Sequence, residues 1–416
     1  MLGRFARYLE RHWNFKGHVA QLQDTRRNAQ VPTSSVFLTI FLAHAIRLGS
    51  FNGTEQQLRI PSRWERWVGQ RKPSADTLGY CLARFDLDPL REWLGDLCQE
   101  AKRKKVFQRL YPDIHWVWAM DGIETYCSRK LHCPTCLVRD ITVNGEKVKE
   151  YYHREVILHL VGIKPGFPLD AEPLLPGDTE VDAALRLLAR WRKQAPRLFD
   201  LFTMDAFYLQ APFAKQVLNS GYGFQAVLKN ETRELYQDVE GLLRQKPASE
   251  KLNVAGRQVE VWDFQNLSTW SQMGRPVRVV RSLEKYEQSH HAPRASKEKW
   301  ETVKKESDWR WAVLLPNGGN PPPDLTRQWG HARWNEESSF MDLTQNWHLD
   351  HSYHHHPVAR LACLLILFLA FIYTAIFFSR NLKPAFWGGM TRLHFARLLA
   401  DDLASSGWKS FWAQPP

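Results

Sequence analysis

An apolar run near the C-terminus is the feature that most constrains how this chain can fold. Residues 361–378 form eighteen positions that are almost all apolar. Such a helix lies at the lower limit of what crosses a bilayer, which takes about 20 apolar residues, and a helix buried on every side in a core has the same composition. Residues 1–16 carry charges throughout, without an apolar signal segment, and no second run of this kind follows. We therefore expect a buried core helix and no membrane.

Changes in residue periodicity divide the 416 residues into four regions. The first has apolar residues spaced three and four apart, which is typical of helices. The second alternates strand-like and helical patterns, which predicts an α/β layer. The third is β-like, and the fourth returns to helical spacing after a run of prolines. We predict a helical region, the first part of an α/β core, a β-rich insertion, and the second part of the core with C-terminal helices, in residues 1–107, 108–231, 232–325 and 326–416.

Positive charge is concentrated in the first quarter of the chain. Residues 1–110 contain 19 Lys and Arg against 10 Asp and Glu, and the run Lys102, Arg103, Lys104 and Lys105 closes the region. Such an excess favours contact with a polyanion, although a basic face that only meets solvent would have the same composition. Six cysteines in a chain of this length do not make a disulfide framework, which favours a reducing cytosol.

Two aspartates follow apolar stretches that have strand-like patterns. Asp121 comes after residues 115–120, and Asp205 comes after residues 198–204. We expect each to end a buried strand, where two carboxylates on neighbouring strands would repel each other unless cations lie between them. The alternative is that each aspartate caps a turn or a helix.

A third acid is expected on a helix near residue 335. Arg333 and Glu337 are four residues apart, so on a helix they share a face and present a carboxylate beside a guanidinium. The alternative is an ordinary surface ion pair. The neighbouring Glu336 and the more distant Glu124 are other possible acids, but the spacing from Arg333 and Phe340 favours Glu337.

These segments together resemble bacterial insertion-sequence transposases of the DDE class. The last acid of one such group lies in a Tyr-x2-Arg-x3-Glu-x6-Lys signature. Arg333 and Glu337 match its spacing, while Gly330 stands in the place of the Tyr and Thr344 in the place of the Lys. The resemblance covers about residues 75–400, and further segments that carry it are 205–208, 227–229, 347–351 and 380–384.

The resemblance implies an RNase H-like catalytic core with a β-rich insertion between the second acid and the third. It implies that Asp121, Asp205 and Glu337 bind two Mg²⁺ or Mn²⁺ ions, because oxygen ligands favour these metals, and that the chain cuts and joins DNA strands. The expected partner is double-stranded DNA, bound by a homodimer in the bacterial cytoplasm, at the nucleoid. The DNA contacts are expected from Arg333, Trp334, Lys229 and the run Lys102, Arg103, Lys104 and Lys105.

Two other functions fit parts of the sequence. A nuclease, or a domesticated DNA-binding relative, could use the same core, although three acids favour activity. A membrane-anchored zinc-binding protein could be built from residues 361–378 and the cysteines.

Three cysteines lie close together after Asp121, in the order Cys127-x5-Cys133-x2-Cys136. With His153, at the start of the next strand, they can supply the tetrahedral set of a structural zinc ion, and His132 is the substitute ligand. The alternatives are reduced thiols packed in a loop, or a redox pair of Cys133 and Cys136. The histidine-rich stretch 348–356 is expected to line phosphates or solvent rather than a metal.

Overall fold

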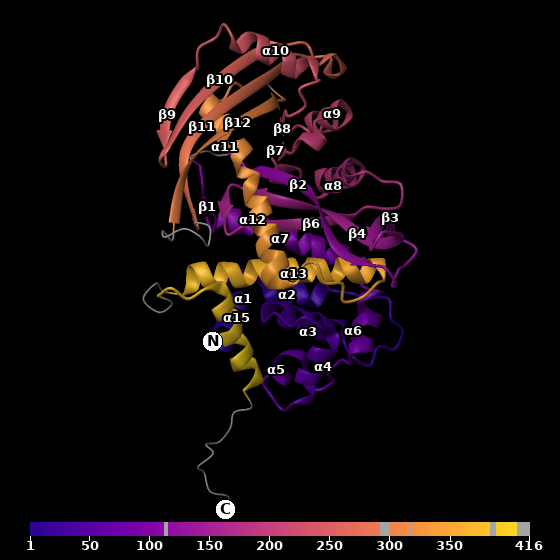
Figure 1. Cartoon of the computed structure of the whole chain (residues 1–416). Coiled ribbons are helices and arrows are strands. Elements are labelled where there is room, and N and C mark those ends of the chain that lie inside the picture. The colour runs from indigo at the N-terminus through magenta and orange to yellow at the C-terminus, as the bar shows by residue number, and fades with distance from the viewer. Residues whose placement is uncertain (112–114, 292–299, 317, 383–387, 406–416) are drawn as a thin grey trace, which may run out of the picture. The chain divides into compact units, whose positions relative to one another are not determined.

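The computed structural model describes residues 1–111, 115–291, 300–316, 318–382 and 388–405. It has mixed helices and strands, which confirms the α/β class (Figure 1). The chain forms two compact units, of which unit 1 comprises residues 1–108, 122–195 and 336–416 and unit 2 comprises residues 109–121 and 196–335. Three of the borders fall inside single elements, namely the short strand β1 (Gln108–Arg109), strand β2 (Val117–Ser128) and helix α12 (Trp334–Trp347).

The N-terminal part of unit 1 is helical, as its spacing predicts. Ser50 and Ser74 cap two of its helices through their side chains, accepting hydrogen bonds from the N–H groups of Gly53 and Thr77. The helices are α1 (Leu2–Trp13), α2 (Phe15–Gln21), α3 (Thr33–Ala45), α4 (Phe51–Arg59), α5 (Glu65–Val68), α6 (Ala75–Leu82) and α7 (Asp88–Arg103).

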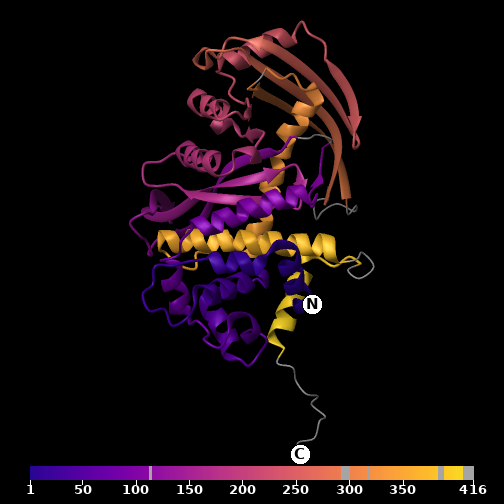
Figure 2. The ribbon, with the colours of Figure 1, turned by 180° about the vertical axis from the view of Figure 1, so that it is seen from behind.

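The apolar run forms the middle of helix α13 (Pro357–Asn381), which Figure 2 shows from behind. The helix packs against α3, α6, α7 and strand β6 of unit 1. Trp93 of α7 donates a 2.8 Å hydrogen bond to the hydroxyl of Tyr373, so even a polar atom on this helix has a buried partner. Helix α15 (Arg392–Ala404) also contacts it.

By length and composition, α13 is the one helix in the described part of the chain that could cross a membrane. Its most apolar window is 94% buried inside the structure. That burial is what a core helix requires, since a helix that is apolar on all sides needs protein on all sides.

The strands of unit 1 pair antiparallel around β4 (Glu146–Val161). Strand β3 (Leu137–Val143) pairs with the first half of β4, and β6 (Phe167–Pro173) pairs with the second half of β4. Strand β2 lies on the other side of β4. Helix α8 (Glu180–Gln194) packs against β4 and β6 and begins with a capping box between Thr179 and Asp182. The short strands β1 (Gln108–Arg109) and β5 (Ile163–Lys164) form a separate pair.

Unit 2 is built on a sheet that begins parallel and continues antiparallel. Strand β7 (Leu201–Met204) runs parallel to the start of β2 and to β8 (Gly223–Val227). Strand β12 (Trp300–Leu314) pairs antiparallel with β8, and β11 (Val277–His291), β10 (Arg257–Leu267) and β9 (Glu250–Val254) follow in this order. Its helices are α9 (Ala211–Asn219), α10 (Glu234–Leu243) and α11 (Pro323–Ala332), and the short 3-10 turns are η1 (Pro196–Leu198), η2 (Ala206–Tyr208) and η3 (Ser271–Met273).

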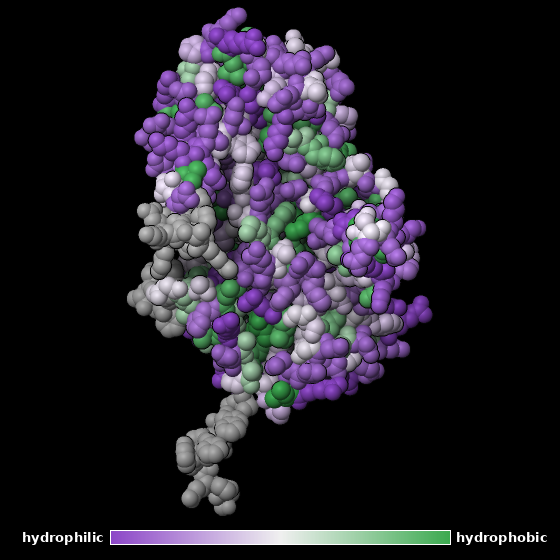
Figure 3. Space-filling view, in the orientation of Figure 1, coloured by the Kyte–Doolittle hydropathy of each residue, from purple (hydrophilic) through white to green (hydrophobic). Residues whose placement is uncertain are grey.

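Two boundaries differ from those expected in this region. Helix α10 lies where the sequence predicts only strands, because its apolar residues Leu235 and Val239 are four apart and face the core. The helix after the prolines begins at Pro323, ahead of the expected border at residue 326, since proline is well tolerated in the first turn. The surface drawn in Figure 3 is mainly hydrophilic, with apolar residues in scattered patches.

A buried carboxylate anchors α11 to strand β11 in unit 2. Glu284 is only 1% exposed and lies 3.1 Å from the guanidinium of Arg327, 3.0 Å from that of Arg257 and 2.6 Å from the ring of His331. Burial raises the pKa of Glu284, but these partners outweigh burial and lower it to about 2. The contacts of Glu284 with Arg327 and His331 therefore fix the position of α11, the helix that leads to Arg333.

Candidate functional site

Asp121 and Asp205 each come four residues after a paired position of two neighbouring parallel strands of unit 2. Val117 of β2 is the register partner of Leu201 of β7, and Trp118 is the partner of Phe202. Each aspartate follows by four residues, after fully buried positions on both strands. The apolar residues thus hold the strands together, and the carboxylates come at the point where burial decreases.

The sequence predicts that a strand ends at Asp121, but strand β2 continues beyond this residue. It continues to Ser128 because its second part, from Gly122, belongs to the sheet of unit 1. Asp121 is therefore half-buried inside a long strand, at the passage from one unit to the other.

Asp205 directly follows β7, as predicted. Its Oδ1 atom accepts a 2.8 Å hydrogen bond from the N–H of Phe207 and so caps the 3-10 turn Ala206–Tyr208. The cap interpretation is thus confirmed, and it orients the carboxylate. Because this bond uses Oδ1, the cap is compatible with a metal bound through Oδ2.

Arg333 lies between α11 and α12, beside the first aspartate. Its Nη1 atom is 3.9 Å from the Oδ2 atom of Asp121, and the residue is buried. Glu337 follows on α12, which confirms the predicted helix, and is half-buried, whereas Glu336 is fully buried. The border between the units passes between Asn335 and Glu336, so Glu337 is described with unit 1.

The residues expected to contact DNA have different environments. Trp334 is 44% exposed and meets Trp309 edge to face, with ring centroids 5.4 Å apart. Lys229 is exposed, and its Nζ atom lies 5.9 Å from the centre of the Trp309 ring. These residues belong to unit 2 and together place an aromatic and cationic surface after β8 and α11.

In the basic run at the end of α7, the side chains are used unequally. Lys104 pairs with Glu100 at 2.8 Å and lies 4.5 Å from the centre of the Trp13 ring. Arg103 is 78% exposed in its side chain and pairs with the same Glu100 at 3.4 Å. Lys104 therefore has an internal role, and Arg103 points mainly to solvent.

A second candidate site, in unit 1, contains two cysteines and two histidines. Cys133, Cys136, His153 and His355 bring one potential metal-binding atom each within 4.8 Å of the others, so this group could hold a metal ion. The Sγ atoms of Cys133 and Cys136 are 3.7 Å apart, and the Nε2 atom of His153 lies 3.4 Å from the first and 3.2 Å from the second.

The ligand set differs from the predicted one at a single position. Cys127 is exposed and lies outside the group, and His355 takes the fourth place. Cys127 is the penultimate residue of β2, whereas the loop that follows folds back through a turn in which Cys136 N–H donates to the carbonyl of Cys133 at 3.0 Å. His132, the predicted substitute, stacks on Tyr151 instead, with centroids 4.5 Å apart.

The sequence predicts that the histidine-rich stretch lines phosphates or solvent, whereas the structure brings His355 into a group that could hold a metal ion. His355 comes directly before His356, the N-cap residue of α13. Its ring packs against that of Tyr126 of β2, with centroids 4.3 Å apart. The signal that could have revealed it is the histidine-rich stretch itself, but five histidines in residues 348–356 do not show which one turns inward.

The surroundings of the cluster keep the imidazole of His153 neutral, which is the form that binds a metal ion. Burial, together with the charges of Arg360 and His355, lowers the pKa of His153 to about 3. Burial opposes ionisation of Cys133, but hydrogen bonds from Thr135 outweigh it and lower the pKa of that thiol. Burial raises the pKa of Cys136.

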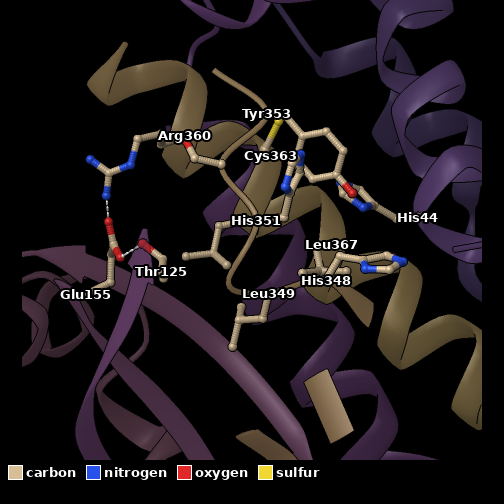
Figure 4. A pocket seen from close by; sticks show the side chains of 12 residues that line it. His44, Thr125, Glu155, His348, Leu349, His351, Tyr353, Arg360, Cys363 and Leu367 are labelled. Atoms are coloured by element: carbon tan, nitrogen blue, oxygen red, sulfur yellow. Dashed lines mark hydrogen bonds and ion pairs between the residues drawn. The ribbon is translucent and has the colours of Figure 1, made fainter. Parts of the chain in front are cut away.

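A buried ion pair lies next to this cluster, in the pocket of Figure 4. Arg360 of α13 points at the carboxylate of Glu155 on β4, and Glu155 also accepts a hydrogen bond from the hydroxyl of Thr125 on β2. Both members of the ion pair are at most 9% exposed. Burial lowers the pKa of Arg360 to about 10, and the nearby Cys133 and Cys136 oppose this shift.

The chain therefore offers two kinds of metal-binding chemistry. The carboxylates of Asp121 and Asp205 are hard oxygen donors, whereas the cluster offers sulfur and imidazole nitrogen. No protein-family model matches the chain, and no curated protein matches it.

Proposed function

We propose that this chain is a DNA transposase of the DDE class, with an RNase H-like core that cuts and joins DNA strands at the ends of an insertion sequence. One observation carries the proposal. Asp121, within β2, and Asp205, directly after β7, each follow by four residues the paired positions Val117 and Leu201, and the guanidinium of Arg333 lies beside Asp121. Two carboxylates so arranged need cations between them, and an adjacent arginine suits a phosphate ligand.

Each residue has a distinct role in this proposal. Asp121, Asp205 and Glu337 hold two Mg²⁺ or Mn²⁺ ions, which activate the attacking oxygen and stabilise the leaving oxygen at phosphorus. Asp205 is oriented for this by its bond to Phe207 N–H. Arg333 positions a DNA phosphate, because its planar guanidinium can donate two hydrogen bonds to it.

The second metal centre has a structural role in the proposal. We propose zinc for Cys133, Cys136, His153 and His355, because two sulfur and two nitrogen donors suit zinc and leave no open position for substrate. In this proposal the Mg²⁺ or Mn²⁺ ions serve catalysis, and the zinc ion stabilises the fold.

The partner in this proposal is double-stranded DNA, bound by a homodimer in the bacterial cytoplasm. Exposed Trp334 and Lys229 would contact it near the catalytic acids, since tryptophan can stack on bases and lysine can contact phosphates. The N-terminal helical region would supply further phosphate contacts, which its excess of basic residues favours.

The proposal is tested with the full chain and duplex DNA that contains the terminal sequences flanking its reading frame. We expect Mg²⁺-dependent cleavage at those ends, followed by joining of the free end to a second DNA. Cleavage without joining would identify a nuclease instead. Binding without cleavage in Mg²⁺ or Mn²⁺ would identify a DNA-binding relative and overturn the catalytic proposal.

A further inference from the structure

We infer that the metal centre and the Glu155–Arg360 ion pair form one clasp, which fastens strand β4 to the N-terminal end of α13, with Arg360 as a positioning residue of the metal site. The inference rests on the zinc ion proposed above. It adds Arg360 to the four ligands as a residue that supports them, and it assigns the site the role of holding β4 and α13 together.

The distances within the cluster match a tetrahedral zinc centre. With bonds of about 2.3 Å to sulfur and about 2.0 Å to nitrogen, a tetrahedron separates two sulfurs by about 3.8 Å and a sulfur from a nitrogen by about 3.5 Å. The measured separations are 3.7 Å between the Sγ atoms, and 3.4 Å and 3.2 Å from these atoms to His153 Nε2. Cys133, Cys136 and His153 thus need almost no rearrangement to enclose an ion, and His355 offers the fourth ligand atom within 4.8 Å of them.

His355 supplies an independent observation. Both of its ring nitrogens are buried, and within the described part of the chain neither has a hydrogen-bond partner. Burial of an imidazole without a partner is costly. A metal bond gives one of these nitrogens its partner and accounts for the inward position of the ring.

The same two elements are joined twice. His153 and Glu155 are two residues apart on β4, so their side chains leave the strand on the same face. His355 and Arg360 lie on the opposite side, just before α13 and in its first turn. The metal joins His153 to His355, and the ion pair joins Glu155 to Arg360.

Charge balance links the two connections. Two thiolates and Zn²⁺ are neutral together, and Glu155 and Arg360 are neutral together, so the complete clasp can be buried without net charge. Removal of one member of a buried ion pair leaves an uncompensated charge. Because Arg360 lies near both thiols, its loss would also remove a positive charge that stabilises the thiolates.

The first experiment measures metal in the full chain, purified without chelator. We expect about one zinc per chain, lost in Cys133→Ser and Cys136→Ser and weakened in His355→Ala. Cys127→Ser is the matched control and should keep its zinc, because Cys127 lies outside the cluster. Cobalt in place of zinc should give the visible spectrum of a tetrahedral site with two sulfur ligands. A folded chain without zinc would refute the zinc proposal itself, and a Cys133–Cys136 disulfide in that chain would identify the pair as redox-active.

The second experiment tests the clasp by chelator competition for zinc. We expect Arg360→Met and Glu155→Gln each to lower zinc affinity by about 10–100-fold. The double variant should lose less than the two single losses combined, since it leaves no unpaired charge. Arg360→Lys should recover part of the affinity. Arg139→Gln, which breaks ion pairs with Glu124 and Glu150 outside the cluster, should leave the zinc affinity unchanged.

The competing outcomes separate the two proposals. Stoichiometric zinc with the same affinity in Arg360→Met, Glu155→Gln and the parent chain would refute the clasp and leave the zinc proposal standing. Equal melting temperatures of the zinc-bound and zinc-free chains would refute the zinc proposal, and the clasp with it, because a metal that binds only the folded state must raise its stability. DNA cleavage is not the readout, so the transposase proposal is tested separately.

Discussion

Asp121 follows Val117 by four residues, just as Asp205 follows Leu201, and Val117 and Leu201 are partners in a parallel pair of strands. Such register brings side chains at equal steps to the same level of the sheet. We therefore expect the two carboxylates to lie on the same edge of the sheet in unit 2, although 83 residues separate them in the chain.

Replacing either aspartate should abolish strand cleavage and leave DNA binding intact. We expect Asp121→Asn and Asp205→Asn to cut at least about 100-fold more slowly, because each removes a ligand of an ion that stabilises the transition state. Glu124→Gln is the control, since Glu124 also lies on β2 but pairs with Arg139. Cleavage of labelled end DNA and its retention in gels measure the two effects. Normal cleavage by both aspartate variants would rule out the proposed site.

The neighbours Glu336 and Glu337 should differ in the same assay. Glu337→Gln should be inactive, because this residue is half-buried at the expected spacing from Arg333. Glu336→Gln should retain activity, since Glu336 is fully buried and its amide replacement has the same shape. If Glu336→Gln is inactive at normal stability while Glu337→Gln cuts, the third acid has been assigned to the wrong residue.

The basic run at the end of α7 should contribute unequally to DNA binding. Arg103→Ala should make the slope of log affinity against log salt less steep by about 1, because an exposed side chain can release one counterion. Lys104→Ala should instead lower the melting temperature, since Lys104 pairs with Glu100 and lies over Trp13. Titrations of the full chain at several salt concentrations measure the first effect. An unchanged slope for Arg103→Ala would exclude it from the phosphate contacts.

Unit 2 should lose stability in acid through Glu284. A carboxylate whose pKa is lowered to about 2 by folding adds stability above its ordinary pKa, and this stability is lost as the pH falls from about 4.5 towards 2. The complete loss should be on the order of 3 kcal/mol, since each pKa unit corresponds to about 1.4 kcal/mol, and roughly 2 kcal/mol of it falls between pH 6 and pH 3. Denaturant unfolding at pH 6 and pH 3 measures it. Glu284→Gln should be less stable at pH 6 and depend less on pH, and an equal pH dependence in both proteins would argue against this role.

Local patterns predicted the elements that are governed by local rules. The helices of residues 1–107, strand β7 before Asp205 and helix α9 are each specified by their own spacing. Two features escaped this reasoning. Strand β2 continues beyond Asp121 because its second part belongs to the sheet of unit 1. The sequence pattern of residues 122–128 does not indicate this pairing.

The metal ligands show the same limit more sharply. Cys133, Cys136 and His153 are near one another in sequence, and their type and spacing identified them. His355 comes from 200 residues further along the chain, and only tertiary packing selects it over its neighbours. Cys127 satisfies the sequence pattern equally well but lies on an exposed strand end.

The position of α13 in unit 1 has a consequence for biosynthesis. This helix packs against α3, α6 and α7, yet the whole of unit 2 lies between them in the sequence. While the ribosome translates that stretch, the apolar surfaces of the N-terminal helices, including Phe37 and Phe41, lack the element that covers them. Nascent chains with such exposed surface aggregate readily and are bound by chaperones. The first domain to emerge is thus the last to be completed, and an interrupted translation product that stops before residue 357 would carry its unfinished core exposed.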